Sequence, residues 1–555
     1  MFFSRNHAVA ALAALMLVFT GWAWGGVVLW TQFVTCALGA IALIIALTPS
    51  SRSSAQLASP RRDFSLALVI GFFVAAGFVT YDGYHLLDQR SSTLQLIPDA
   101  VLPEMRFSDW GLRGGLAGFG SMLLSLLALG LRTPTHARSL LLRFPPFWIG
   151  VALFGFISIQ SLNPWGVVVE RDLTWKIIQQ DYISWIPAGL AAPFVGDDDP
   201  GGMNGWRQML ILSGPWMLLC ALRIAVTHRR TYAHLAWIVG LNSMAVGVVG
   251  AVVAAGKDLT FLGFKNWFAY KAPFGPFIYK NHAGIYLYLS AAIVLALTAH
   301  LIARRGDRAD RGGPHLIAAI LFVMLCLASA STLSVGAFFG VGALLLLAPA
   351  LYFVDRHVSA ALSPAPALML LGLASLVIYV AGSSSKMDIL RERVEKKRAY
   401  VEQAGSDDRG PIRRATLSQI TDGDTSRLAF GWGAGSYRWT SPVYMVNQPE
   451  FVDSKGRLWA RANYAHCDWL QALLEWGVVG CFILFPVLAW LWIKILHAIH
   501  RRSASQLALS AALVLVLAHA ALDFIFYFTP TLTLLALIVA WLASAEDPAD
   551  SRLGY

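Results

Sequence analysis

The chain has 555 residues, of which 57% are hydrophobic and only 14% are charged, and its mean hydropathy is +0.59. This balance excludes a soluble globular protein, in which about a quarter of the residues are charged. The formal net charge is +11. The basic residues gather in short loops between apolar runs, so no nucleic-acid partner is expected.

Apolar runs long enough to cross about 30 Å of hydrocarbon recur along the whole chain. They predict an all-α polytopic membrane protein with about fourteen transmembrane helices embedded in a phospholipid bilayer. The first run is expected to stay as a helix rather than be cleaved as a signal peptide, because a second follows almost at once. The expected spans lie near 7–24, 26–48, 64–80, 111–131, 146–162, 208–226, 235–255, 283–302, 316–333, 335–354, 364–381, 470–495, 506–523 and 527–545.

Arginines cluster in every second short loop, for example at Arg61 and Arg62 and at Arg304 and Arg305. Because basic residues favour the cytoplasmic side, both termini are expected in the cytoplasm. The loops expected on the opposite side lie near 81–110, 163–207, 256–281 and 382–468. Three regions follow, namely an N-terminal bundle of about eleven spans, a long periplasmic loop with short helices, and about three C-terminal spans. Their bounds are 1–381, 382–468 and 469–555.

The outward loop before the span at 283–302 ends in Tyr279-Lys280-Asn281-His282. It is rich in lysine, against the charge rule, and this departure suggests an anionic ligand outside the membrane.

The long outward loop opens with a stretch near 386–400 whose apolar residues follow a helical period. It is expected to be a surface helix, either a solvated lid or a polyanion-binding helix. Further on, Arg413 and Arg414 precede a glycine-rich stretch, which Arg438 closes. Gly431, Gly433 and Gly435 permit close backbone approach. Exposed amides beside arginines can cradle a phosphate, although glycines of this kind usually just form turns.

The most informative stretch is Ala465-His466-Cys-Asp468-Trp-Leu-Gln471-Ala-Leu-Leu-Glu475. Asp468, Gln471 and Glu475 fall on one face of the helix that begins there. An imidazole is the natural general base near neutral pH, so His466 is a candidate catalytic residue, with a purely structural histidine as the alternative. Later, His519 and Asp523 are four residues apart and are expected to pair and brace two helices.

Together these segments resemble the O-antigen ligase and Wzy polymerase superfamily of bacterial envelope enzymes, over about 265–545. The stretch around Asn281 and His282 is similar to the family's Asn-His helix start. An arginine followed by Phe430-Gly-Trp-Gly-Ala-Gly435 looks like its glycine turn. The His466 stretch looks like its histidine signature, and His519 with Asp523 is similar to a late His-x-x-x-Asp.

The resemblance implies a metal-independent, inverting glycosyltransferase of the GT-C type in the bacterial inner membrane, with a periplasmic active site and no cofactor. Its partners would be an undecaprenyl-diphosphate-linked glycan donor and a lipid or glycan acceptor. His466 would deprotonate the acceptor hydroxyl, and Arg413 or Arg414 would hold the diphosphate. One departure is Val335, which stands where the family has an arginine. Side chains that can replace that arginine are Lys280, Arg427, Arg438 and Arg461.

A ligase and a polymerase share these motifs, and the sequence favours an O-antigen ligase slightly. The alternative of another class is a membrane transporter or flippase. Transporters commonly carry internal repeats and broken helices at the bilayer midplane. The chain shows no such repeat, and its polar residues gather outside the apolar runs.

Overall fold

The computed structural model describes most of the helical bundle and the polar segments at one end of it. The expected spans near 64–80, 111–131 and 364–381, the expected helix near 386–400 and Arg461 lie outside the described residues. Those residues are 5–48, 135–171, 174–194, 203–226, 228–255, 260–261, 264–265, 274–305, 313–354, 409–452, 456, 458 and 462–544.

Each expected span within the described residues coincides with a helix, because apolar runs of this length satisfy their backbone polar groups internally. The long helices are α1 (Arg5–Trp22), α2 (Leu29–Leu47), α6 (Pro145–Leu162), α7 (Gly205–Ala225), α8 (Arg229–Ala255), α9 (Lys280–Arg305), α10 (Pro314–Ser331), α11 (Val335–Val354), α18 (Asp468–Arg501), α19 (Ala504–His519) and α20 (Thr529–Ser544). The short helices are η1 (Trp24–Gly26), α5 (Thr135–Leu142), α15 (Gly410–Thr421), α16 (Thr425–Phe430), α17 (Tyr437–Met445) and η4 (Pro449–Phe451).

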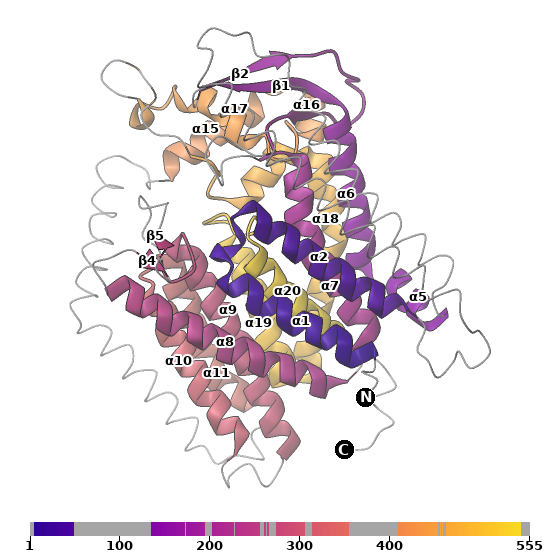
Figure 1. The fold of residues 1–555 in the computed structure, drawn as a ribbon, viewed down its shortest axis with the longest axis vertical. Helices are drawn as coiled ribbons and strands as arrows, with labels where there is room; N and C mark the ends of the chain where they lie inside the picture. Colours follow the sequence, from indigo (N-terminus) through magenta and orange to yellow (C-terminus); the bar gives the residue numbers. More distant parts are fainter. Residues whose placement is uncertain are drawn as a thin grey trace.

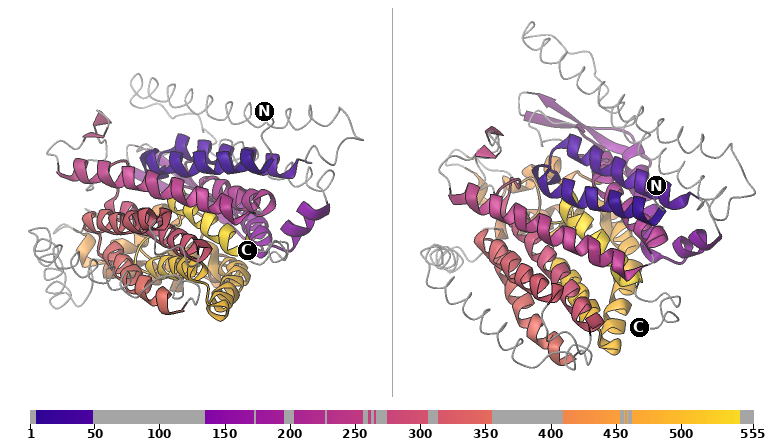
Figure 2. Two further views of the ribbon diagram at one scale, coloured as in Figure 1. Left: turned by 90° about the horizontal axis from the view of Figure 1, so that it is seen from below. Right: turned by 60° about the horizontal axis from the view of Figure 1, so that its bottom comes forward.

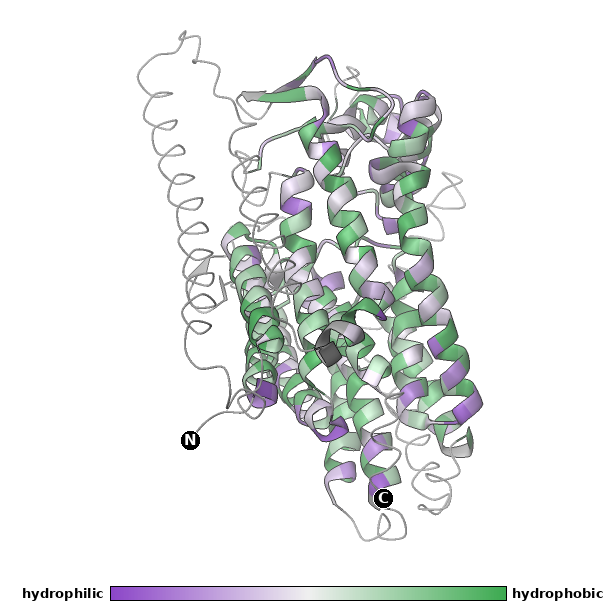
Figure 3. Ribbon diagram, turned by 90° about the vertical axis from the view of Figure 1, so that its right-hand side faces the viewer, coloured by the Kyte–Doolittle hydropathy of each residue, from purple (hydrophilic) through white to green (hydrophobic). Residues whose placement is uncertain are grey.

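Among the described residues, seven helices are long and apolar enough to cross a membrane, judged by length and composition. They are α2, α6, α7, α8, α9, α10 and α18. Hydrophobic residues cover the length of these helices, whereas hydrophilic ones gather toward the ends of the bundle (Figure 3). The chain is therefore a mostly helical membrane protein.

Helix α9 lies at the centre of the bundle, where α8, α10, α11 and α19 pack against it (Figure 2). Helices α2 and α7 form another close pair, and α20 also packs on α7. A Cβ atom on Gly39 would lie 2.3 Å from the carbonyl oxygen of Gly214. Small residues at this crossing thus let the two backbones touch, as is common between helices in membranes.

Two small sheets depart from the all-α prediction. The first has the strand order β2–β1–β3, with β1 (Pro164–Arg171) antiparallel to β2 (Thr174–Gln179) and parallel to β3 (Gly189–Ala191). In its register Val167 faces Ile178. The second pairs β4 (Thr260–Phe261) with β5 (Phe264–Lys265). Both sheets fall in stretches that the sequence placed outside the spans. In the first sheet, the β-branched run Val167-Val168-Val169 favours a strand.

The polar segments gather at one end of the molecule. Strands β1 and β2 and helices α15, α16 and α17 lie together there, whereas α1 begins lower in the view, away from them (Figure 1). Helix α18 starts among these polar segments and is broken at Gly477, whose φ of 63° and ψ of −172° are not helical. Beyond the break its apolar side chains are exposed, with Phe482 at 70% and Phe485 at 60%.

Candidate functional site

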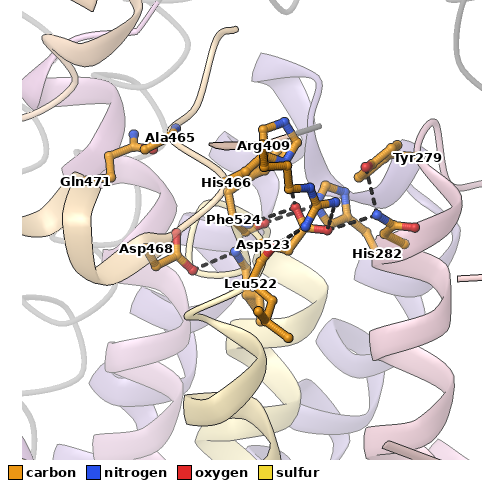
Figure 4. A network of polar contacts seen from close by, with 12 residues as sticks. Tyr279, His282, Arg409, Ala465, His466, Asp468, Gln471, Leu522, Asp523 and Phe524 are labelled. Carbon is orange, nitrogen blue, oxygen red and sulfur yellow. Dashed lines mark hydrogen bonds and ion pairs between the residues drawn. The ribbon is translucent and has the colours of Figure 1, made fainter. Parts of the chain in front are cut away.

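The centre of the candidate site is a histidine–carboxylate pair. His466 lies just before α18, with a φ of 48°, and Asp523 lies in the loop between α19 and α20. His466 Nδ1 is 3.0 Å from Asp523 Oδ1, and the ring packs edge-on against Phe524 (Figure 4). The Asp523 side chain is only 1% exposed, whereas that of His466 is 20% exposed. The imidazole therefore lies at the accessible side of a buried anion.

This contact sets the proton arrangement of the imidazole. Asp523 Oδ1 is an acceptor, so the neutral ring donates from Nδ1 and carries its lone pair on Nε2. A carboxylate in this position also stabilises the imidazolium that forms when Nε2 takes a proton. The pair thus has the chemistry of a general base.

The other oxygen of Asp523 is held by two further groups. Arg409 Nη2 donates to Asp523 Oδ2 over 3.1 Å, and Asn281 Nδ2 donates to the same atom over 2.8 Å. Arg409 Nη1 also donates to the Leu522 carbonyl. Burial alone would raise the pKa of the Asp523 carboxyl, but the hydrogen bond from His466 and the charge of Arg409 hold it well below its usual range. Asp523 is therefore a permanent anion near neutral pH.

Asp468, the first residue of α18, fixes the loop that carries Asp523. Its backbone N–H donates to the Ala520 carbonyl over 2.7 Å. Its Oδ2 accepts hydrogen bonds from Ile525 N at 2.6 Å and Phe526 N at 3.1 Å. Asp468 thus fixes the loop on both sides of Asp523. Figure 4 shows the contact of the Asp468 side chain with this loop.

The two neighbouring arginines of α15 point in different directions. Arg413 Nη2 donates to the Ala521 carbonyl over 3.0 Å and so belongs to the Asp523 loop. Arg414 instead bonds to Gln448 and Glu450, at 3.1 and 2.7 Å, and its side chain is 46% exposed. Of the two arginines considered for the diphosphate, only Arg413 lies in the site.

The residues around the start of α9 approach the same loop. Besides Asn281, His282 Nε2 lies 3.0 Å from the Phe524 carbonyl oxygen. Lys280 Nζ donates to the Leu333 carbonyl over 3.4 Å, two residues before Val335. Arg438 is not among the contacts of Asp523 or His466 that the structure describes, and its guanidinium lies 5.6 Å from the centre of the Trp439 ring.

The glycine turn packs against α18 instead of the Asp523 loop. Gly431, Gly433 and Gly435 all have positive φ angles, of 80°, 108° and 74°. A Cβ on Gly431 would lie 2.3 Å from the Glu475 carbonyl oxygen. The amide of Gly433 donates to that same oxygen over 3.0 Å. Backbone amides of the turn, which the sequence suggested as phosphate ligands, thus donate to carbonyl oxygens of α18. The turn anchors this helix.

Gln471 and Glu475 form a buried network behind the site. Gln471 accepts from Ala465 N at 3.0 Å and donates to Glu475 Oε1 over 3.1 Å. Glu475 Oε2 accepts from Tyr527 and Gln208, at 2.9 and 3.1 Å. Glu475 is completely buried. These side chains share one helical face, as the spacing predicts, and join α18 to α7 and to the loop before α20.

The expected side-chain pair of His519 and Asp523 does not form. His519 Nδ1 lies 3.2 Å from the Tyr288 hydroxyl. The Asp523 carboxylate turns to His466, Arg409 and Asn281 instead. The loop directs Asp523 away from α19 because Asp468 holds the following backbone. Arg409 is thus a site residue that the sequence did not select, and Asp523, which the sequence selected as a partner of His519, is the partner of His466 instead.

In the part of the chain that the structure describes, no three His, Cys, Asp or Glu side chains come close enough to hold a metal ion. The site consists of a histidine, a carboxylate, guanidiniums and amides.

A scan against protein-family models gives no match to the chain, and a search of the curated proteins gives none either.

Proposed function

We propose that the chain is an inverting glycosyltransferase that moves a glycan from a polyprenyl-diphosphate donor to an acceptor hydroxyl. The observation that carries this proposal is the His466–Asp523 pair, with Arg409 and Arg413 beside it, at one end of an apolar helix bundle. A partly exposed general base that is held by a buried carboxylate and lies next to guanidiniums suits a reaction whose leaving group is a diphosphate.

In the proposed step, His466 Nε2 takes the proton of the acceptor hydroxyl while its oxygen attacks the anomeric carbon. The bond from that carbon to the diphosphate oxygen breaks, and the diphosphate leaves with the electron pair. Asp523 stabilises the imidazolium. Arg413 and Arg409 offer positive charge to the leaving group, and positioned cations can supply this stabilisation without a metal ion.

Lys280 supplies a third cation, near the place where the resembled family has an arginine. Its Nζ donates to Leu333, two residues before Val335, so the ammonium lies beside the start of α11. Lys280 follows Tyr279 and precedes Asn281 in the chain. Asn281 Nδ2 donates to both the Tyr279 hydroxyl and Asp523 Oδ2, so this stretch adjoins the Asp523 carboxylate. We assign Lys280 to the second phosphate of the donor.

The finer architecture belongs to the same proposal. It comprises about fourteen spans with a GT-C-like arrangement, a position in the bacterial inner membrane, cytoplasmic termini and a periplasmic site. The gathering of the polar segments at one end of the bundle, away from the start of α1, supports it (Figure 1). An O-antigen ligase is favoured over a Wzy-type polymerase.

Deletion of the gene in its host, followed by gel sizing of lipid-linked and surface glycans, tests the function. Full-length polymer that stays on its lipid carrier would establish a ligase, whereas single repeats would establish a polymerase. Unchanged glycans would refute the proposal and favour transport. Activity of the purified enzyme in EDTA is expected to persist, and loss that magnesium restores would contradict a metal-independent step.

Arg413 and Arg414 provide a matched pair of variants for complementation. Arg413→Gln should lower transfer at least tenfold, because a charge-assisted contact to a phosphate is worth about 1.5–3 kcal/mol. Arg414→Gln should change transfer by less than about fivefold, since an exposed ion pair contributes only about 0–1 kcal/mol. Equal effects of the two substitutions would remove Arg413 from the proposed site.

A further inference from the structure

Arg427 in α16 forms a second polar feature that the reaction at His466 does not use. Its guanidinium carbon lies 4.0 Å from the centre of the Trp165 ring and 4.1 Å from that of Trp432. The two rings meet at 79°, so the cation occupies the corner between them. Such cation–π contacts consume none of the five N–H donors of the guanidinium.

These donors distinguish Arg427 from its neighbours. Among the residues that the structure describes, no oxygen accepts a hydrogen bond from the Arg427 side chain, and no carboxylate lies in ion-pair contact with it. Arg409, Arg413 and Arg414 at the same end of the molecule all donate to protein oxygens. Arg427 is half-buried. Its N–H donors are therefore left without a protein acceptor among the described residues.

The surroundings hold this guanidinium in place before any ligand arrives. Trp165 Nε1 donates to the Trp432 carbonyl over 2.9 Å and locks the two indoles together. Asp424 caps α16 by accepting from Arg427 N at 2.8 Å. Ser426 Oγ donates to the Ser184 carbonyl over 2.7 Å and ties α16 to the loop before β3. A preorganised cation loses less freedom on binding than a mobile surface arginine.

Aromatic side chains flank the same corner. The Tyr444 ring lies 6.3 Å from that of Trp432 at 80°, and Tyr182 packs against the apolar cluster that contains Trp165. Aromatic rings offer apolar faces to a ligand, and a guanidinium offers a fork of donors that matches carboxylate or phosphate oxygens. An acidic sugar combines these two features.

We propose that this Arg427 corner, made of Arg427, Trp165, Trp432, Tyr182 and Tyr444, binds a carboxylate or phosphate substituent of a sugar in the transferred glycan. The inference rests on the proposed function for the presence of a glycan. The amide of Trp432 donates to the Leu474 carbonyl, which lies six residues, or about 9 Å of helix, from Asp468. The backbone of Trp432 is therefore about two turns of α18 from the helix start that His466 precedes, and further sugars of a transferred glycan would have to span this separation to reach the corner.

Binding of small acidic sugars to the full-length protein in phosphatidylcholine nanodiscs tests the proposal. The probes are trigalacturonate for the carboxylate and mannose 6-phosphate for the phosphate, with neutral maltotriose as comparison. Arg427→Gln should weaken binding of the acidic probe at least about tenfold, because a charge-assisted bidentate contact is lost. Arg427→Lys should fall between, because an ammonium keeps the charge but lacks the fork.

Two matched variants separate this inference from other effects. Lys176→Gln removes one exposed positive charge from β2 and should bind the probes as the wild type does. His466→Ala should also bind normally, so a failure of the proposed reaction and a failure of the Arg427 corner give different results. If Arg427→Gln lowers the melting temperature, the comparison rests on Arg427→Lys.

Unchanged binding in Arg427→Gln, equal binding of maltotriose, or no binding of either acidic probe by the wild type would overturn the proposal. A phospholipid headgroup carries the same oxyanion chemistry. If dependence on Arg427 appears only as binding to nanodiscs that contain phosphatidylglycerol, the ligand is a lipid and the glycan assignment fails.

Discussion

Two parts of the segment 409–468 combine arginine with glycine, but they fold into different environments. The first part sends Arg409 and Arg413 to the loop around Asp523, where they meet a buried carboxylate and its backbone. The second part, Gly431–Gly435, packs its backbone against α18. The comparison teaches that the arginine side chains of the first part reach the candidate site, whereas the glycine backbone of the second part holds a helix in place.

The sharpest way to test the chemical half of this comparison is His466→Ala. Loss of a general base should lower transfer by about 10²–10⁴-fold. Folding should change little, because His466 is partly exposed. Transfer rate and melting temperature of the purified protein check both expectations. His500→Ala, an exposed histidine near the far end of α18, is the matched control. Near-normal transfer by His466→Ala would exclude it as the base.

The architectural half is tested by Gly431→Ala. The alanine would have to keep the positive φ of 80° that Gly431 adopts. Its Cβ would also lie 2.3 Å from the Glu475 carbonyl oxygen. Backbone strain and overpacking should together lower the free energy of unfolding by about 2–4 kcal/mol. A thermal melt in detergent measures this loss. At Gly155 in α6 a Cβ meets nothing within 4 Å, so Gly155→Ala should be neutral or stabilising. Equal stability of both variants would contradict the anchoring role.

Asp468 connects the two halves, because it belongs to α18 but holds the Asp523 loop. Asp468→Ala leaves the buried amides of Ile525 and Phe526 without their acceptor, at a cost of about 1–3 kcal/mol for each. Asp468→Asn keeps an acceptor oxygen and should retain more stability and more transfer. Parallel melts and transfer assays of the two variants decide this. If the asparagine variant is as impaired as the alanine variant, the negative charge itself matters.

The smallest effect is expected from the pH dependence of stability at Asp523. Its pKa is depressed in the folded protein, so its contribution is present above the ordinary aspartate pKa of about 3.9 and is lost as the pH falls toward the lower folded value. Asp523→Asn lacks this contribution. The wild type should exceed the variant by on the order of 1 kcal/mol near pH 7. Melts from about pH 7 to about pH 3 should show the gap closing on acidification, and a constant gap would contradict the assignment.

Much of the bundle follows from the sequence. Apolar runs placed α1, α2, α6 to α11 and α18 to α20, because a helix is the simplest way to satisfy a backbone in hydrocarbon. The sheet of β1, β2 and β3 escaped prediction, since its strands are short and lie in a stretch judged only by charge and length. The sheet falls within 163–207, a stretch that the sequence placed between spans.

The site was predictable only in part. Asp468, Gln471 and Glu475 could be selected because their spacing places them on one helical face, and His466 because its imidazole beside them is a natural base. The partner of His466 could not, since Asp523 lies 57 residues away in a loop whose course depends on Asp468. The four-residue spacing of His519 and Asp523 suggested a wrong pair. Arg413 and Arg414 are adjacent in sequence, and only the rotation of α15 separates their roles.

The break at Gly477 divides α18 into two lengths with different surroundings. The first, Asp468–Trp476, is tied to the Asp523 loop and to the glycine turn. The second presents Phe482 and Phe485 outward over a length suited to hydrocarbon. Helices tilt to match the thickness of the bilayer around them. Because the φ and ψ of Gly477 interrupt the helix there, we expect a tilt of the outer length to be taken up at this joint rather than at the His466–Asp523 pair.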